Sequence, residues 1–196
     1  HDWQAALVPL YLRTCFKDTN VGRASAVLTI HNLKFQGIYD RKMIQYWSGL
    51  PDYVFNKDCM IQNWLDANML KGGIAYANKV TTVSNTYAWE IQTEEYGEGL
   101  AEHLRYHSDK IRGIVNGIDT DNWNPATDKL LAANYDAETA IANKKINKKT
   151  LQESLGLDVD DHKIVIGLIS RLTNQKGLDL VNAVIPGIMD GNTQVV

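Results

Sequence analysis

The chain has 196 residues, a formal net charge of −3 and 44% hydrophobic residues, a composition typical of a globular protein that can bury a sizeable core. The acidic balance gives no support to binding of nucleic acid or of an anionic membrane, and no apolar run reaches the roughly 18 residues that a membrane-spanning helix needs. The length equals about 1.3 typical domains, and the first residue is His1 rather than Met, so we expect a fragment.

Strands are predicted where β-branched residues cluster. In chain order the predicted strands are Ala24–Ile30, Lys79–Ser84, Lys110–Val115, Lys163–Ser170 and Thr193–Val196. The consecutive apolar residues of Lys163–Ser170 predict a parallel strand that is buried on both faces.

Helices are predicted between these strands from the spacing of apolar residues. They span Trp3–Leu12, Asn63–Ala77, Asn85–Glu95 and Gly177–Met189. Ser84 is suited to cap the third helix, and Pro186 should kink or end the fourth. Strands that alternate with helices predict an α/β fold with a parallel sheet.

A change in composition near residue 120 predicts a domain boundary. Asp119–Asp128 is rich in turn residues, and Asp136–Lys149 carries many charges. We expect the boundary between about residues 124 and 145, and we divide the chain into residues 1–130 and residues 131–196, the start of a second domain.

The spacing of the cysteines and of three histidines gives no indication of a metal site. Cys15 and Cys59 lack metal-ligand or redox spacing and are expected to be buried, reduced thiols of a cytoplasmic protein. His103, His107 and His162 lie among polar neighbours and are expected on the surface. The spacing of the first two could suit a metal, but no third ligand follows at a suitable distance.

The first candidate site follows the strand that ends at Ile30. His31 and Asn32 come next, at the carboxyl end of the strand, where ligands bind in open α/β sheets. A histidine there can donate hydrogen bonds to a sugar hydroxyl or a phosphate. The alternative is a histidine whose side chain only forms hydrogen bonds with the backbone of its own loop. Asn116 ends another strand and could bond a sugar hydroxyl, but an ordinary Asn-Gly turn is the slightly favoured explanation.

The second candidate site lies between Ser170 and Gly177. Arg171 and Lys176 flank a predicted turn from a strand to a helix, and this pair suits a diphosphate. The alternative is two solvated side chains at the start of a helix, but the helix dipole disfavours cations there. No phosphate-binding Walker A loop, dinucleotide-binding glycine motif, hydrolase nucleophile motif or zinc-protease motif is present in the sequence.

Six motifs in order give the chain a family resemblance. They are His1-Asp2-Trp3; Thr29-Ile30-His31-Asn32-Leu33 with Gln36-Gly37; Val83-Ser84 with Thr86-Tyr87; Tyr96-Gly97 with Gly99-Leu100; Asn116-Gly117-Ile118-Asp119 with Trp123 and Pro125; and Ser170-Arg171-Leu172-Thr173 with Gln175-Lys176-Gly177. Together they resemble the bacterial glycogen synthases and plant starch synthases, over essentially the whole chain.

The resemblance implies a retaining glycosyltransferase of the GT-B fold, with two Rossmann-like domains. Such an enzyme transfers glucose from ADP-glucose to the non-reducing end of an α-1,4-glucan, without a metal or other cofactor. His31 then matches the histidine that contacts the donor glucose and supports the transition state. Asn116 matches an asparagine on the sugar, Arg171 and Lys176 match the pair on the distal phosphate, and Asp2 matches an aspartate in the cleft. By this resemblance residues 1–130 belong to the acceptor-side domain and residues 131–196 to the nucleotide-sugar domain.

Two family motifs are absent from the chain. The Lys-x-Gly-Gly-Leu loop would precede His1, and the motif with the glutamate would follow Val196, so we expect the isolated chain to have no synthase activity. Two alternatives remain open. One is a non-catalytic module that binds glucan or nucleotide, and the other is a GT-B transferase that uses a different nucleotide sugar.

Overall fold

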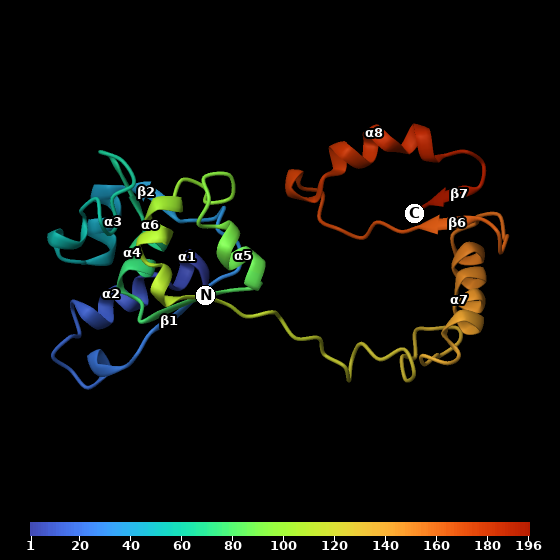
Figure 1. Ribbon diagram of the computed structural model, residues 1–196, viewed down its shortest axis with the longest axis horizontal. Helices are drawn as coiled ribbons and strands as arrows, with labels where there is room; N and C mark the ends of the chain where they lie inside the picture. The colour runs from blue at the N-terminus through green and yellow to red at the C-terminus, as the bar shows by residue number, and fades with distance from the viewer. The chain divides into compact units, whose positions relative to one another are not determined.

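The computed structural model describes residues 1–196, and the chain divides into two compact units, His1–Gly117 and Ile118–Val196 (Figure 1). The division lies earlier than the boundary expected after residue 130 and leaves the turn-rich Asp119–Asp128 in the second unit. Each unit is described by itself.

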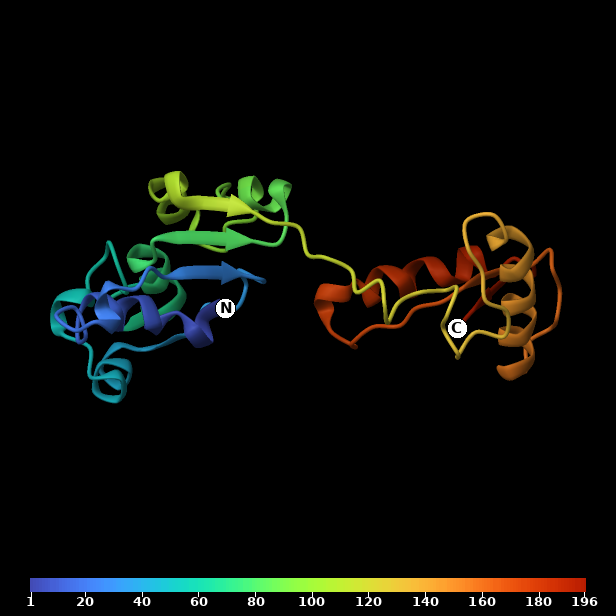
Figure 2. The ribbon, with the colours of Figure 1, turned by 90° about the horizontal axis from the view of Figure 1, so that it is seen from below.

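A three-stranded parallel sheet forms the centre of the first unit (Figure 2). Its order is β1 (Val27–Ile30), β4 (Lys79–Thr82) and β5 (Ile111–Gly113). All three strands lie within ranges predicted from the sequence. Ile30 pairs with Thr82, and Thr82 pairs with Gly113, so the carboxyl ends of all three strands meet at one edge of the sheet.

The amino-terminal helix is split. Helix α1 (Asp2–Ala5) and helix α2 (Leu7–Arg13) replace the single helix predicted over Trp3–Leu12. Ala6 lies between them and packs tightly on helix α4 (Met69–Tyr76): a Cβ at Gly73 would lie 2.7 Å from the Cβ of Ala6. Only glycine allows this approach of the two backbones.

The helix predicted over Asn63–Ala77 is correct only from Met69 onward. Its first part contains β3 (Asp66–Asn68), which pairs antiparallel with β2 (Ile38–Asp40). The side-chain oxygen of Asn68 accepts a hydrogen bond from the backbone N–H of Lys71 and caps α4, which explains why the helix begins there.

Three other helices complete the first unit. They are α3 (Arg41–Ser48), α5 (Asn85–Glu90) and α6 (Ala101–Tyr106). The side chain of Ser84 caps α5, as predicted, by accepting from the N–H of Tyr87 at 3.2 Å. Single 3-10 turns lie at η1 (Val21–Arg23), η2 (Asp52–Val54) and η3 (Ser108–Lys110).

The hydrophobic core of the chain lies entirely in the first unit. Every buried apolar side chain lies between Ala6 and Ile111. One cluster packs around β1, β4 and α4, and a second packs around α2, α3 and the segment before β3. Both cysteines are free thiols; Cys59 is buried as expected, but Cys15 is exposed, because it follows the end of α2.

The second unit contains two helices and a two-stranded sheet. Its elements are α7 (Ala140–Ser154), β6 (Ile164–Ile166), η4 (Asn174–Lys176), α8 (Leu178–Ile188) and β7 (Thr193–Val195). Helix α7 overlaps the charged stretch Asp136–Lys149, where a domain boundary was predicted. Pro186 lies in the last turn of α8. No helix of the chain has the length and apolar character that crossing a membrane requires.

The predicted length and burial of the strand over Lys163–Ser170 were wrong. It is shorter than Lys163–Ser170, and Ile164 and Ile166 are 60% and 41% exposed rather than buried on both faces. The physical reason is that β6 pairs with β7 alone and no apolar side chain of this unit is fully buried.

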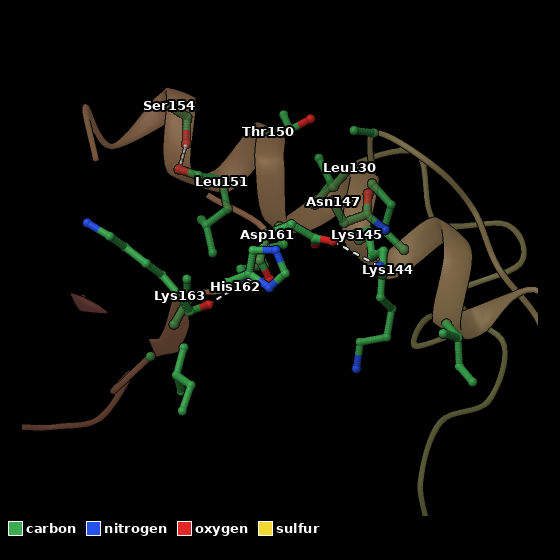
Figure 3. A pocket seen from close by; sticks show the side chains of 17 residues that line it. Leu130, Lys144, Lys145, Asn147, Thr150, Leu151, Ser154, Asp161, His162 and Lys163 are labelled. Carbon is green, nitrogen blue, oxygen red and sulfur yellow. Dashed lines mark hydrogen bonds and ion pairs between the residues drawn. The ribbon is translucent and has the colours of Figure 1, made fainter. Parts of the chain in front are cut away.

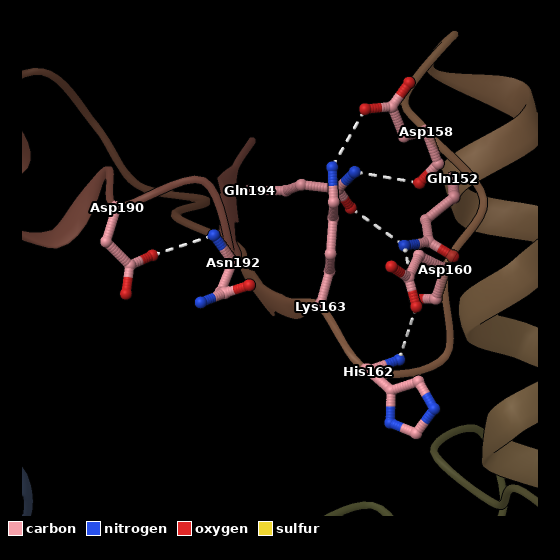
Figure 4. A network of polar contacts seen from close by, with 8 residues as sticks. All are labelled: Gln152, Asp158, Asp160, His162, Lys163, Asp190, Asn192 and Gln194. Atoms are coloured by element: carbon pink, nitrogen blue, oxygen red, sulfur yellow. Dashed lines mark hydrogen bonds and ion pairs between the residues drawn. The ribbon is translucent and has the colours of Figure 1, made fainter.

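A polar network links α7 to the sheet of the second unit (Figure 4). The buried amide of Gln152 donates to Oε1 of Gln194 at 2.8 Å, and the amide of Gln194 donates to the backbone carbonyl of Asp158 at 2.8 Å. Lys163 forms an ion pair of 2.8 Å with the Asp158 carboxylate. Hydrogen bonds thus make the contacts that apolar side chains make in the first unit.

Candidate functional site

The edge of the sheet after β1 brings together three of the predicted site residues. Asp2 Oδ1 accepts a hydrogen bond of 2.7 Å from the backbone N–H of His31 and a longer one of 3.4 Å from that of Asn32. Asp2 has a φ of +51°. Residues other than glycine adopt this left-handed backbone conformation only at a cost in free energy. The aspartate therefore holds the start of the loop through its carboxylate.

The side chain of His31 contacts a second histidine. Nδ1 of His1 lies 2.8 Å from Nε2 of His31, and the two rings stack with centroids 5.0 Å apart and planes inclined by 27°. Both side chains are exposed. No role for His1 was predicted from the sequence.

Tyr87 holds the other side of this loop. Its hydroxyl oxygen accepts a hydrogen bond of 3.2 Å from the backbone N–H of Leu33. Burial raises the pKa of the Tyr87 hydroxyl, and the negative charges of Glu98 and Asp2 act in the same direction. The side-chain oxygen of Asn32 accepts from the N–H of Lys34 at 3.1 Å, so this oxygen serves its own loop.

Gln36 joins this loop to two other segments. Its amide donates to the backbone carbonyl of Glu98 at 2.9 Å, and its Oε1 accepts from the amide of Asn68 at 2.6 Å. Glu98 has a φ of +47°. The only sequence signal for this role was the position of Gln36 in the motif around His31, and its contacts are too distant in sequence to predict.

Asn116 follows β5 at the same edge of the sheet. Its side chain is exposed and forms no hydrogen bond with Asp2, His31 or Asn32. The structure therefore places Asn116 at the predicted edge but does not join it to the cluster around His31.

Arg171 and Lys176 lie in the second unit, in the segment between β6 and α8. Because β6 ends at Ile166, Arg171 lies in an irregular stretch rather than directly after a strand. Lys176 ends the turn η4, and Gly177, with a φ of +66°, caps α8. Both cations are exposed and neither forms an ion pair.

Two of the histidines expected on the surface are partly buried instead. The rings of His103 and His107 meet edge to face at 4.7 Å, and His103 hydrogen bonds to the backbone carbonyl of Lys71 at 3.0 Å. Burial, reinforced by positive charge on His107, lowers the pKa of His103 to about 4. His162 is exposed as expected. No group of three or more histidine, cysteine, aspartate or glutamate side chains is placed to hold a metal ion.

A hollow of the second unit lies between α7 and the segment around β6 (Figure 3). It has a volume of about 880 Å³ and contains neither Arg171 nor Lys176. Its cationic groups are largely occupied: Lys145 pairs with Asp161 at 2.9 Å, and Lys148 donates to the backbone carbonyl of Asp161 at 2.8 Å. The hollow is therefore not the predicted diphosphate site.

Comparison with known proteins identifies the family. The family model described as the starch synthase catalytic domain matches residues 1–106. The chain belongs to this family. Glycogen synthases from Lachnospira eligens and Thermotoga petrophila are each 49% identical to it over 197 aligned residues, which cover the whole chain.

A solved structure supports the GT-B assignment of this chain. The catalytic domain of starch synthase IV from Arabidopsis thaliana, bound to ADP and acarbose, is 37% identical over the whole chain, with a TM-score of 0.91. The α/β fold with parallel sheets, predicted from the sequence, is confirmed. The chain spans about two fifths of these relatives: 41% of the Lachnospira protein, 40% of the Thermotoga protein and 40% of the Arabidopsis chain.

Proposed function

We propose that this chain is part of a retaining glucosyltransferase that moves glucose from ADP-glucose to the non-reducing end of an α-1,4-glucan and releases ADP. The observation that carries the proposal is the fixed placement of His31 and Asn32 at the carboxyl end of β1, with Asp2 bonded to the backbone N–H of His31 at 2.7 Å. The relatives named glycogen synthase, and a starch synthase structure bound to ADP and acarbose, support the same reaction.

In this proposal His31 contacts the donor glucose and stabilises the sugar as it gains oxocarbenium character. Asn116, at the same edge of the sheet, hydrogen bonds to a sugar hydroxyl. The carboxylate of Asp2 already accepts two backbone hydrogen bonds from the loop. We therefore assign Asp2 to orienting that loop in addition to the substrate contact inferred from the sequence.

Arg171 and Lys176 hold the distal phosphate of the donor. Neither side chain is neutralised by an ion pair, so both charges are free to bind an anion. A departing diphosphate gains negative charge, and two fixed cations stabilise that charge in the transition state. The proposal invokes no metal and no other cofactor.

These assignments place the two substrates on different parts of the chain. Residues 1–130 contribute to the acceptor side, and residues 131–196 begin the nucleotide-sugar side. We place the reaction in the cytoplasm, which is consistent with two cysteines that are both free thiols.

A chimera tests the proposal. The 196 residues replace the matching segment of the Lachnospira eligens glycogen synthase, to which they are 49% identical. We expect the purified chimera to transfer radiolabelled glucose from ADP-glucose to glycogen, and the isolated chain to transfer none. The parent enzyme is the positive control.

Three results would contradict the proposal. A chimera whose circular dichroism and size match those of the parent, but which transfers no glucose, would favour the non-catalytic module. Transfer from UDP-glucose or a mannose donor, but not from ADP-glucose, would favour the other class of transferase. Glucose transfer by the isolated chain would show that the reaction does not need the Lys-x-Gly-Gly-Leu loop or the motif with the glutamate.

A further inference from the structure

We propose that His1 is a positioning residue that holds the imidazole of His31 in one orientation and leaves one defined ring nitrogen for a ligand. The inference rests on the proposed role of His31 in glucosyl transfer. It assigns a role to His1, a member of the first family motif for which the sequence gave no role.

The geometry of the pair determines which nitrogen of His31 remains free for a ligand. Nδ1 of His1 and Nε2 of His31 are 2.8 Å apart, so one ring donates and the other accepts a single proton. In either direction of the hydrogen bond, Nε2 of His31 is occupied. A ligand can therefore form a hydrogen bond only with Nδ1 of His31 while the pair is intact.

The backbone on both sides of the ring is fixed independently. Asp2 accepts from the N–H of His31 at 2.7 Å, and Tyr87 accepts from the N–H of Leu33 at 3.2 Å. These bonds set the path of the loop but leave the side-chain torsions of His31 free.

His1 supplies the missing restraint. The His31 side chain is exposed, and the hydrogen bond to His1 is the only one that its ring forms. The stacking of the two rings, with planes inclined by 27°, fixes the rotation that a single hydrogen bond leaves open. Ordering an exposed side chain costs conformational entropy, and a ring ordered before the substrate binds does not add that cost to catalysis.

The test uses two substitutions at His1 in the chimera. His1→Leu removes both the hydrogen bond and the aromatic stacking. In His1→Asn the side-chain amide reaches approximately the position of Nδ1 and keeps a hydrogen-bonding group there. We expect His1→Leu to lower kcat about tenfold with little change in KM and an unchanged Tm, and His1→Asn to keep most of the activity. His162→Leu, an exposed histidine of the second unit, is the matched control and should behave like the unsubstituted chimera.

A spectroscopic measurement on the 196-residue chain tests the contact without any activity. Nitrogen-15 NMR of the imidazole rings should show Nε2 of His31 in a hydrogen bond, and the Nε2 signal should shift when His1→Leu removes its partner. Unchanged kcat in His1→Leu, equal loss in the Leu and Asn variants, or unchanged His31 signals would each overturn the proposal. If the unsubstituted chimera transfers no glucose, the proposed function fails, and the NMR result alone decides whether His1 orders the ring.

Discussion

Asn68 donates a 2.6 Å hydrogen bond from its side-chain amide to Oε1 of Gln36, and both side chains are buried. The same asparagine accepts from the backbone N–H of Lys71 at 2.9 Å and caps α4. The amide of Gln36 continues the chain of contacts to the carbonyl of Glu98. One pair of amides therefore joins α4 to the loops that contain His31 and Glu98.

Substitution of Asn68 by Ala should destabilise the first unit by about 2–4 kcal/mol. About 1 kcal/mol comes from the lost helix cap, and the rest comes from the buried oxygen of Gln36 that loses its donor. Urea unfolding, followed by tryptophan fluorescence, measures the change. Asp40→Ala is the matched control: Asp40 caps α3 by accepting from the N–H of Met43 at 2.8 Å, but it is exposed. Equal losses of unfolding free energy in the two variants would show that the buried pair of Asn68 and Gln36 adds no stability beyond the helix cap.

The first unit should lose stability as the pH falls from 6.5 to 4. Burial, with positive charge on His107, lowers the pKa of His103 from its ordinary value of 6.5 to about 4 in the folded chain. The unfolded chain therefore binds this proton first, so the stabilisation is complete above pH 6.5 and disappears as the pH approaches 4. Because the side chain is only partly buried, we expect a loss of about 1–2 kcal/mol after solvent screening.

Denaturation at pH 7 and pH 4.5 measures this effect. His103→Gln keeps a hydrogen-bonding side chain but cannot titrate, so its stability should change less between the two pH values. His162→Gln, at an exposed position, should behave like the unsubstituted chain. The same acid-induced loss in His103→Gln would assign the effect to other groups.

His31→Ala in the chimera should lower kcat more than it raises KM for ADP-glucose. A side chain that acts mainly on the developing charge of the sugar contributes to the transition state and little to binding of the ground state. Steady-state kinetics over a range of donor concentrations separates the two. A rise in KM at constant kcat would assign His31 to donor binding alone.

Lys176→Ala in the chimera should both raise the donor KM and slow transfer, at a total cost of about 2–4 kcal/mol. The loss is that of a charge-assisted contact to the departing diphosphate. Lys149→Ala is the control in the same unit, because Lys149 is an exposed lysine that makes only a 3.9 Å contact to Glu153. Donor-dependent kinetics measures both variants, and a Lys176 variant that matches the control would remove Lys176 from the site.

The parts of the fold that the sequence predicted depend on local signals. Runs of β-branched residues mark β1, β4 and β5, and the Ser84 cap marks the start of α5. Strands β2 and β3 have three residues each and form through a pairing of Ile38 with Asn68, which no local pattern encodes. The exposure of β6 was wrongly predicted because burial depends on what packs on a strand as well as on its own residues.

In the candidate site, too, residues marked by local sequence signals were predicted and long-range contacts were not. His31 and Asn32 were predicted because they directly follow a recognisable strand, and Asp2 was assigned through the family motif. The roles of His1, Gln36 and Tyr87 depend on contacts with residues distant in the sequence: His1 with His31, Gln36 with Glu98, and Tyr87 with Leu33. Such contacts become visible only once the chain has folded.

The confinement of every buried apolar side chain to the first unit has a calorimetric consequence. Heat absorption on unfolding scales with the number of residues that leave a packed state, at about 0.7 kcal/mol per residue near 60 °C. A thermal scan of this chain should therefore record a single peak with the enthalpy of the unit His1–Gly117, about 80 kcal/mol on that scale. The second unit should contribute a sloping baseline instead of a transition of its own.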